Sequence, residues 1–167
     1  MFQLIQYKPN TDRVYKKPLL ITPPWINKFY ILDLRQENSL IKYCVDQGHT
    51  VFVISWVNPD ADYADCGFDT YLDEGLLTAI NNVLNVTGEK SLNVAGYCIG
   101  GTLLACAAAY LTEIGEESKL NKITFFTTMT DFREPGELGN FLEPGFLKGI
   151  EAQVAQTGYL ESYFMSR

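Results

Sequence analysis

A cysteine flanked by glycines, Gly96-Tyr97-Cys98-Ile99-Gly100-Gly101, is the part of the sequence best suited to covalent chemistry. The spacing Gly-x-Cys-x-Gly is that of a nucleophile elbow, with cysteine where serine is usual. In such an elbow the nucleophile sits on a strained turn between a strand and a helix, and the flanking glycines let nearby backbone pass without meeting a Cβ atom. Considered without its sequence context, the pattern fits a glycine-rich turn around a buried structural cysteine equally well.

The context of the motif favours the chemical interpretation. An apolar run ends at Ala95, directly before the motif, and an Ala- and Leu-rich helical pattern follows it. The free N–H groups and positive end of that helix would then face Cys98, which lowers the pKa of a thiol and favours the thiolate. We therefore predict Cys98 as a nucleophile and the amide of Ile99 as one donor of an oxyanion hole.

The elements that must hold this turn alternate along the chain. Apolar runs predict strands, of which those at 18–21, 50–55 and 123–128 are expected to be buried. Apolar residues three or four apart predict helices. This alternation predicts an α/β fold with a mainly parallel sheet and right-handed crossovers. The expected strands are residues 2–7, 18–21, 50–55, 92–95 and 123–128, the expected helices are residues 38–46, 68–86, 99–114 and 146–165, and residues 131–149 are expected to be mostly turns.

Composition narrows the function classes. The 167 residues carry 13 Lys and Arg against 20 Asp and Glu, a net charge of -7, and 47% are hydrophobic. This balance fits a folded protein and argues against nucleic-acid binding, and no apolar run is long enough for a membrane span. The first residues lack the layout of a signal peptide, so we expect a cytoplasmic protein.

The other cysteines are not expected to bind metal. The four cysteines form no C-x-x-C pair and the chain has one histidine, so neither a zinc cluster nor another metal site is predicted. Cys44 and Cys106 fall in helical patterns and are expected to pack in the core. Cys66 falls in a loop and has no predicted partner.

Several stretches of the chain carry a family resemblance. They are residues 23–34 (PPWINKFYILDL), 47–52 (QGHTVF), 55–56 (SW), 58–60 (NPD), 96–101 (GYCIGG) and, more weakly, 136–139 (GELG). These stretches resemble the poly(3-hydroxyalkanoate) synthases, also called PHB polymerases. The resemblance runs over essentially the whole chain, and it looks closest to the single-subunit class that prefers short-chain substrates.

The resemblance implies an α/β-hydrolase fold in which Cys98 attacks the thioester of a 3-hydroxyacyl-CoA, typically (R)-3-hydroxybutyryl-CoA. CoA leaves, and the acyl group passes to the hydroxyl end of a growing polyester. The CoA thioester is a substrate, so no cofactor is expected. The implied partners are this substrate, the polyester, a second copy in a homodimer, and granule-associated proteins, with the polyhydroxyalkanoate granule surface as a second location.

The fold implied by the resemblance also points to the loop at residues 23–28. Its second oxyanion donor comes from the loop after an early strand, and we assign this role to the amide of Ile26. Asn27 is predicted to order the substrate pocket. Trp25 and Trp56 either line that pocket or fill the core. Lys28 either reaches a CoA phosphate or is an ordinary exposed loop lysine.

The chain departs from the family in its catalytic triad. The family uses Cys, Asp and His in that order, but no histidine follows Cys98. His49 precedes the nucleophile and is expected to be structural, and Asp131 is expected to be a turn or packing residue. The simplest explanation is that these residues are the central fragment of a catalytic domain, with a core at 1–130 and the start of a cap at 131–167. The alternative is a genuine short protein that has lost catalysis.

Three functions follow from these observations. The first is a polyhydroxyalkanoate synthase whose isolated 167 residues are not expected to turn over substrate. The second is a cysteine esterase or thioesterase, in which water accepts the acyl group. The third is a non-catalytic module that binds a synthase or a granule, which the missing histidine favours. An incomplete sheet would expose an edge and an apolar face, so we predict marginal stability.

Overall fold

The computed structural model describes residues 1–160, apart from the side chains of Leu138, Asn140 and Phe141. The described chain forms two compact units. The first comprises residues 1–57 and 68–129 and carries Cys98. The second comprises Asn58–Gly67 and the segment from Thr130 onward. It contains 3₁₀ turns at Ala61–Tyr63 and Gly136–Leu142 and helix α5 at Pro144–Thr157. The expected cap at 131–167 stays a prediction.

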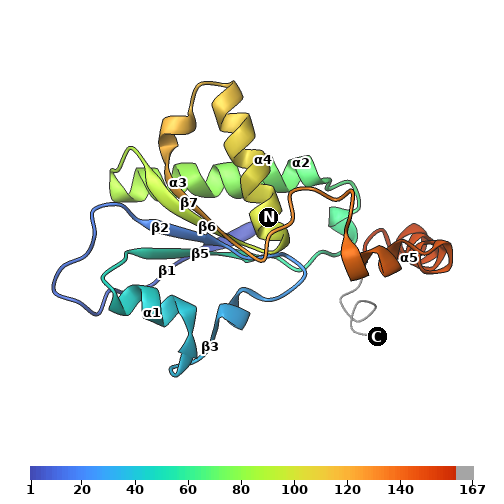
Figure 1. Cartoon of the computed structure of the whole chain (residues 1–167), viewed down its shortest axis with the longest axis horizontal. Coiled ribbons are helices and arrows are strands. Elements are labelled where there is room, and N and C mark those ends of the chain that lie inside the picture. Colours follow the sequence, from blue (N-terminus) through green and yellow to red (C-terminus); the bar gives the residue numbers. More distant parts are fainter. Residues whose placement is uncertain (161–167) are drawn as a thin grey trace. The chain divides into compact units, whose positions relative to one another are not determined.

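A five-stranded sheet forms the centre of the first unit (Figure 1). Its strand order is β1-β5-β2-β6-β7, with β1 antiparallel to β5 and the other neighbouring pairs parallel. The predicted mainly parallel sheet is therefore confirmed. The strands are β1 (Phe2–Gln6), β2 (Leu19–Thr22), β5 (Val51–Trp56), β6 (Leu92–Tyr97) and β7 (Leu120–Phe126), and a separate hairpin pairs β3 (Asp33–Arg35) with β4 (Asn38–Ser39).

Helices lie on both faces of this sheet (Figure 1). From β2 the chain moves to β5 on one side, and it then returns past β2 to β6 and β7 on the other side. Because both kinds of connection are right-handed crossovers, their helices lie on opposite faces of the sheet. Helix α1 (Leu40–Asp46) covers one face, and α3 (Thr78–Thr87) and α4 (Ile99–Glu113) cover the other. Alternate strand residues fill each core, as Ile21 and Val53 do toward α1 and Leu20 and Phe52 do toward α3 and α4.

The predicted helix at 68–86 is one helical segment with a widened middle. A short α-helical stretch, α2 (Phe68–Thr70), leads into a π-helical turn at Tyr71–Leu77 and then into α3. The segment ends at Gly88, whose φ of 69° suits a glycine. Gly75 in the π turn lies against the indole of Trp56, because a Cβ there would be 2.7 Å from Trp56 Cζ3. Turns of this kind often occur near functional sites.

Three predicted elements differ from the observed ones. The helix predicted at 38–46 starts at Leu40, because Asn38–Ser39 forms strand β4 and Ser39 is the N-cap of α1. The strand predicted as buried at 123–128 is β7, Leu120–Phe126, and most of it is exposed. The reason is its place: among the described residues it pairs with β6 alone, so it forms the outer edge of the sheet. Helix α5 spans Pro144–Thr157 with Gly158 as its C-cap, so it starts two residues before the predicted 146–165 and ends earlier than predicted. Residues 161–167 lie outside the described part.

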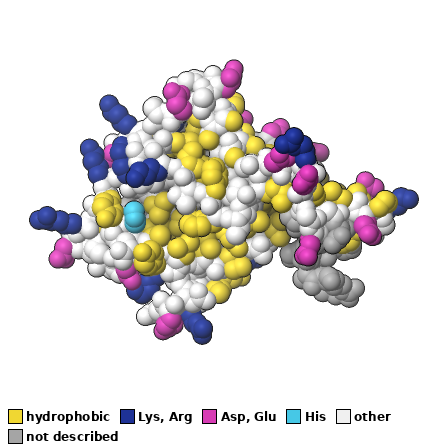
Figure 2. Space-filling model, in the orientation of Figure 1, with side chains coloured by type: hydrophobic (Ala, Val, Ile, Leu, Met, Phe, Trp, Pro, Cys, Tyr) yellow, Lys and Arg dark blue, Asp and Glu magenta, His cyan; other side chains and the backbone are white. Residues whose placement is uncertain are grey.

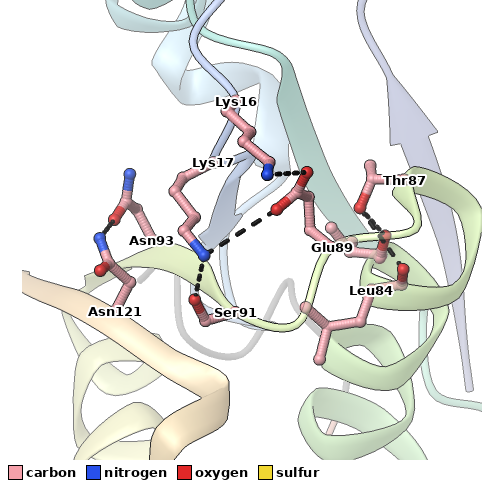
Figure 3. A network of polar contacts seen from close by, with 9 residues as sticks. Lys16, Lys17, Leu84, Thr87, Glu89, Ser91, Asn93 and Asn121 are labelled. Atoms are coloured by element: carbon pink, nitrogen blue, oxygen red, sulfur yellow. Dashed lines mark hydrogen bonds and ion pairs between the residues drawn. The ribbon is translucent and has the colours of Figure 1, made fainter.

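Polar contacts join the strands at the end of the sheet where β2 and β6 begin (Figure 3). Lys17 Nζ donates to Ser91 Oγ at 2.6 Å and lies 3.9 Å from a carboxylate oxygen of Glu89. Asn121 Nδ2 donates to Asn93 Oδ1 at 2.7 Å, which links β7 to β6. These bonds hold neighbouring strands together at the end of the sheet opposite to Cys98.

Candidate active site

Cys98 occupies the turn between β6 and α4, as the elbow pattern predicts. Its backbone has φ 55° and ψ −127°, a left-handed conformation that is uncommon for residues other than glycine. The Cys98 amide donates to the Phe126 carbonyl at 3.0 Å, which continues the pairing of β6 with β7 past the end of the strand. The side chain is exposed, and the helix that starts at Ile99 leaves its first amides without intrahelical acceptors. Cys98 is therefore presented on a strained turn at the end of the sheet, which agrees with the geometry expected of a nucleophile elbow.

The glycines of the motif are required by close backbone contacts. A Cβ on Gly96 would lie 2.5 Å from Gly101 Cα. A Cβ on Gly100 would lie 2.4 Å from the Thr22 carbonyl oxygen and 2.7 Å from that of Pro23. The first contact keeps the turn tight, and the second brings the start of the loop after β2 against the first turn of α4.

The loop after β2 therefore begins beside the turn that carries Cys98. Thr22 is paired in register with Gly96, so β2 and β6 end at the same edge of the sheet. Parallel strands that end together place their following loops next to each other, which is where ligands bind in open α/β sheets. Trp56, the last residue of β5, donates from Nε1 to the Pro23 carbonyl at 2.8 Å and ties this loop to a third strand.

The segment after β7 forms the other side of the elbow and was not identified from the sequence. A Cβ on Gly101 would lie 1.9 Å from Thr128 Oγ1 and 2.9 Å from Thr128 Cβ, so a larger residue there would require Thr128 to shift. Thr102 Oγ1 donates to the Met129 carbonyl at 2.8 Å. Thr127 has a φ of 43°, a second non-glycine residue in the left-handed region. The two consecutive glycines at 100–101 were the sequence signal for this contact. Gly100 faces the loop after β2, and Gly101 faces the segment after β7.

The structure places the predicted loop residues as follows. Ile26 and Asn27 are exposed on the loop that starts at Pro23, while the Ile99 amide opens α4. Trp25 is half-buried and stacks on Tyr71, with ring centroids 4.5 Å apart. Its ring therefore packs against the core cluster. The oxyanion roles of Ile26 and Ile99 and the substrate roles of Asn27 and Trp25 stay predictions.

His49 lies at the wrong end of the sheet to act on Cys98. It precedes β5, whereas Cys98 follows β6, and both strands run parallel to β2. A six-residue strand is about 20 Å long, so the two side chains are separated by roughly the length of the sheet. His49 packs its ring on Tyr15 at 4.9 Å, and its Nδ1 is buried without a hydrogen-bond partner among the described residues.

The remaining candidates are spread over both units. Cys44 is half-buried, and burial raises the pKa of its thiol. Cys106 is exposed, which corrects the expectation that it packs in the core: it lies on the outward side of α4. Asp131 is exposed and pairs with Arg133, and this ion pair lowers the pKa of the Asp131 carboxyl. In the described part of the chain no cluster of His, Cys, Asp or Glu is arranged to hold a metal ion.

An apolar cavity of about 260 Å³ opens on the α1 face of the sheet, and Cys98 is not among its lining residues. Figure 2 shows apolar side chains gathered over this part of the molecule, with the histidine beside them. Cys44, His49 and Tyr97 are among the lining residues, with side chains from β2, β6 and β7. Within residues 1–160, no helix has the length and apolar character of a membrane span.

Comparison with known proteins decides the family. A family model described as "Poly-beta-hydroxybutyrate polymerase (PhaC) N-terminus" matches residues 1–44. A poly(3-hydroxyalkanoate) polymerase of Methylorubrum extorquens is 51% identical over 99% of this chain and 27% of its own length. The poly(3-hydroxyalkanoate) polymerase subunit PhaC of Rhizobium meliloti is 48% identical over 98% of this chain and 27% of its own length. The chain belongs to the poly(3-hydroxyalkanoate) polymerase family.

The chain spans about a quarter of the length of these polymerases. Solved structures show the fold of this segment. A carboxylesterase structure from Nitrososphaera gargenis matches 93% of this chain and 53% of its own with a TM-score of 0.56 at 13% identity. A Bacillus megaterium epoxide hydrolase matches 92% of this chain and 51% of its own with a TM-score of 0.56 at 12% identity. This likeness confirms the α/β-hydrolase fold of the segment.

Proposed function

We propose that this chain is the nucleophile-bearing part of an acyltransferase that polymerises (R)-3-hydroxyacyl-CoA, such as 3-hydroxybutyryl-CoA, into polyhydroxyalkanoate. The observation that carries the proposal is Cys98, exposed on a strained strand-to-helix turn in a chain related to polymerases over nearly its whole length. The exposure of the sulfur and the helix behind it suit a group that must attack a bulky thioester.

The first half-reaction exchanges one thioester for another. The thiolate of Cys98 attacks the carbonyl carbon of the acyl-CoA and forms a new C–S bond, and the carbonyl oxygen becomes an oxyanion. The amides of Ile99 and Ile26 would donate to that oxygen. The C–S bond to CoA then breaks, CoA leaves as a thiolate, and the acyl group stays on Cys98. A cysteine suits this step because the bond formed and the bond broken are of the same kind.

The second half-reaction moves the acyl group to a hydroxyl. The oxygen of the hydroxyl end of the polyester attacks the Cys98 thioester, an ester bond forms, and the Cys98 thiolate is released. The hydroxyl proton needs a base, and the one histidine of the chain lies about a sheet length away. We therefore assign the acylation step to these residues, and the polymer-forming step to the polymerase as a whole.

The family resemblance also supports three partners and a location. They are the growing polyester, a second copy in a homodimer, and granule-associated proteins at the granule surface. The exposed apolar residues of β7 fit such contacts, since patches of this kind often mark interaction surfaces.

Product analysis tests the proposal against the two alternatives. The chain and its Cys98→Ala variant are incubated with 3-hydroxybutyryl-CoA, and free CoA, free 3-hydroxy acid and insoluble polyester are measured. Release of about one CoA for each chain, dependent on Cys98, supports the acyltransferase. Continued release of free 3-hydroxy acid identifies a thioesterase instead. Identical results for the chain and the variant leave a non-catalytic binding module.

A further inference from the structure

Trp56 connects the end of β5 to the loop beside the nucleophile. Its Nε1 donates to the carbonyl oxygen of Pro23 at 2.8 Å. Pro23 is buried and lies one residue beyond Thr22, the last paired residue of β2. A buried carbonyl outside the sheet ladder needs a donor, and the indole supplies it.

The indole itself is held in one orientation from several sides. Gly75 in the π turn leaves room for it, since a Cβ there would be 2.7 Å from Trp56 Cζ3. Phe2 is its cross-strand partner, with ring centroids 6.1 Å apart. Trp25 meets it edge-on at 6.0 Å and Tyr71 lies at 5.3 Å. A ring enclosed in this way keeps its N–H aimed at one acceptor.

The carbonyl that Trp56 holds also touches the elbow. Pro23 O is 2.7 Å from the place of a Cβ on Gly100, two residues after Cys98. Ile26 follows Pro23 by three residues. One carbonyl oxygen therefore joins the loop that carries Ile26 to the first turn of α4, which carries the Ile99 amide.

We propose that Trp56 is a positioning residue for the acyl-transfer site. By holding the Pro23 carbonyl it fixes the loop at residues 23–28 against α4, and so sets the spacing between the amides of Ile26 and Ile99. This inference rests on the proposed function for the roles of those amides, while the ordering of the loop by Trp56 can be tested without any reaction.

Hydrogen exchange on the full chain tests the loop ordering. Trp56→Phe removes the N–H, and replacement of Trp56 by benzothienylalanine removes it while keeping the shape of the ring. Phe2→Leu is the control, because it removes a ring contact of Trp56 but leaves the hydrogen bond. We expect the amides of residues 25–30 to exchange about tenfold faster in both Trp56 variants, with β6 amides unchanged. Unchanged loop exchange in both variants, or equal acceleration in loop and β6, overturns the proposal.

Two reactions of Cys98 then separate positioning from general loosening. Alkylation by iodoacetamide passes through no oxyanion, whereas acylation by 3-hydroxybutyryl-CoA does. The Trp56 variants should be acylated about tenfold more slowly and alkylated within about twofold of the normal rate. Equal slowing of both reactions overturns the positioning role. A wild-type chain that is alkylated but never acylated contradicts the proposed function, and the exchange result still decides whether Trp56 orders the loop.

Discussion

The carbonyl oxygen of Thr22 lies 2.4 Å from the position that a Cβ on Gly100 would occupy. The Thr22 carbonyl belongs to the backbone at the end of β2, and the Gly100 Cα belongs to the backbone in the first turn of α4. Neither can move without displacing a strand or a helix, so the loop after β2 and the turn that carries Cys98 form one rigid arrangement. Glycine is therefore required at position 100 by the packing of backbone against backbone.

Gly100→Ala should destabilise the first unit by at least about 2 kcal/mol, because overpacking against backbone cannot be relieved by a side-chain rotation. Urea unfolding followed by tryptophan fluorescence measures this change, since both tryptophans lie in the first unit. Gly145→Ala is a control in the second unit: its Cβ would meet nothing within 4 Å, so the tryptophan signal of the first unit should keep its wild-type midpoint. Equal stability of the two variants would contradict the packing argument.

Thr22→Val should leave stability unchanged or raise it by up to about 1 kcal/mol. The Thr22 side chain is fully buried, and its hydroxyl has no hydrogen-bond partner among the described residues. Valine has nearly the same shape and carries no polar atom to desolvate. Thr102→Val is the control, because it removes the bond to the Met129 carbonyl and should cost about 1 kcal/mol. A larger loss for Thr22→Val in the same urea titration would show that its hydroxyl has a partner.

The hydrogen bond from Tyr7 to Asp33 predicts a loss of stability in alkali. Tyr7 donates to Asp33 Oδ2 at 2.9 Å, and burial together with this carboxylate raises the pKa of Tyr7. A folded-state pKa above the unfolded value means that the contribution is full below about pH 10, the ordinary tyrosine value, and falls as pH rises further. Tyr7→Phe should flatten this fall when unfolding midpoints are compared from about pH 9 to pH 11. An identical alkaline slope in both proteins would exclude Tyr7 as its cause.

Exposed apolar residues on β7 predict self-association. Phe125 is 45% and Phe126 41% exposed on a strand whose outer edge is unpaired in the described chain. Phe125→Lys should lower association in sedimentation experiments, since a charge on an edge strand opposes pairing with another chain. Val86→Lys, at a 68% exposed position on α3, removes apolar surface away from the edge and should change little. If both variants reduce association equally, the edge is not its cause.

The fold was predictable from the sequence because its signals are local. The apolar run before Cys98 and the Ala- and Leu-rich pattern after it gave β6 and α4 to within two residues. The burial of β7 was predicted wrongly, because an apolar run does not show whether a strand lies inside a sheet or at its edge. The π turn at Tyr71–Leu77 was missed for a similar reason, since the indole that packs against its Gly75 comes from a distant strand.

The site was predictable only in part. The Gly-x-Cys-x-Gly spacing located the strand-to-helix turn that carries Cys98, because an elbow imposes its glycines on the local sequence. The partners of those glycines come from distant segments: Thr22 and Pro23 on one side and Thr128 on the other. No local sequence pattern predicts such contacts. The hydrogen bond from Trp56 to Pro23, for example, joins residues 33 positions apart. The position of His49 at the opposite end of the sheet likewise required the strand order.

The most direct test of the account is to locate the acyl group. The chain is incubated with 3-hydroxybutyryl-CoA, quenched in acid, and examined by intact mass and by peptide mapping. The account predicts one 3-hydroxybutyryl thioester on the peptide that contains Cys98, absent from Cys98→Ala and retained in Cys106→Ala, where the other exposed cysteine is removed. Acylation of Cys106 instead, or equal labelling of the wild-type chain and Cys98→Ala, would contradict the assignment of Cys98 as the nucleophile.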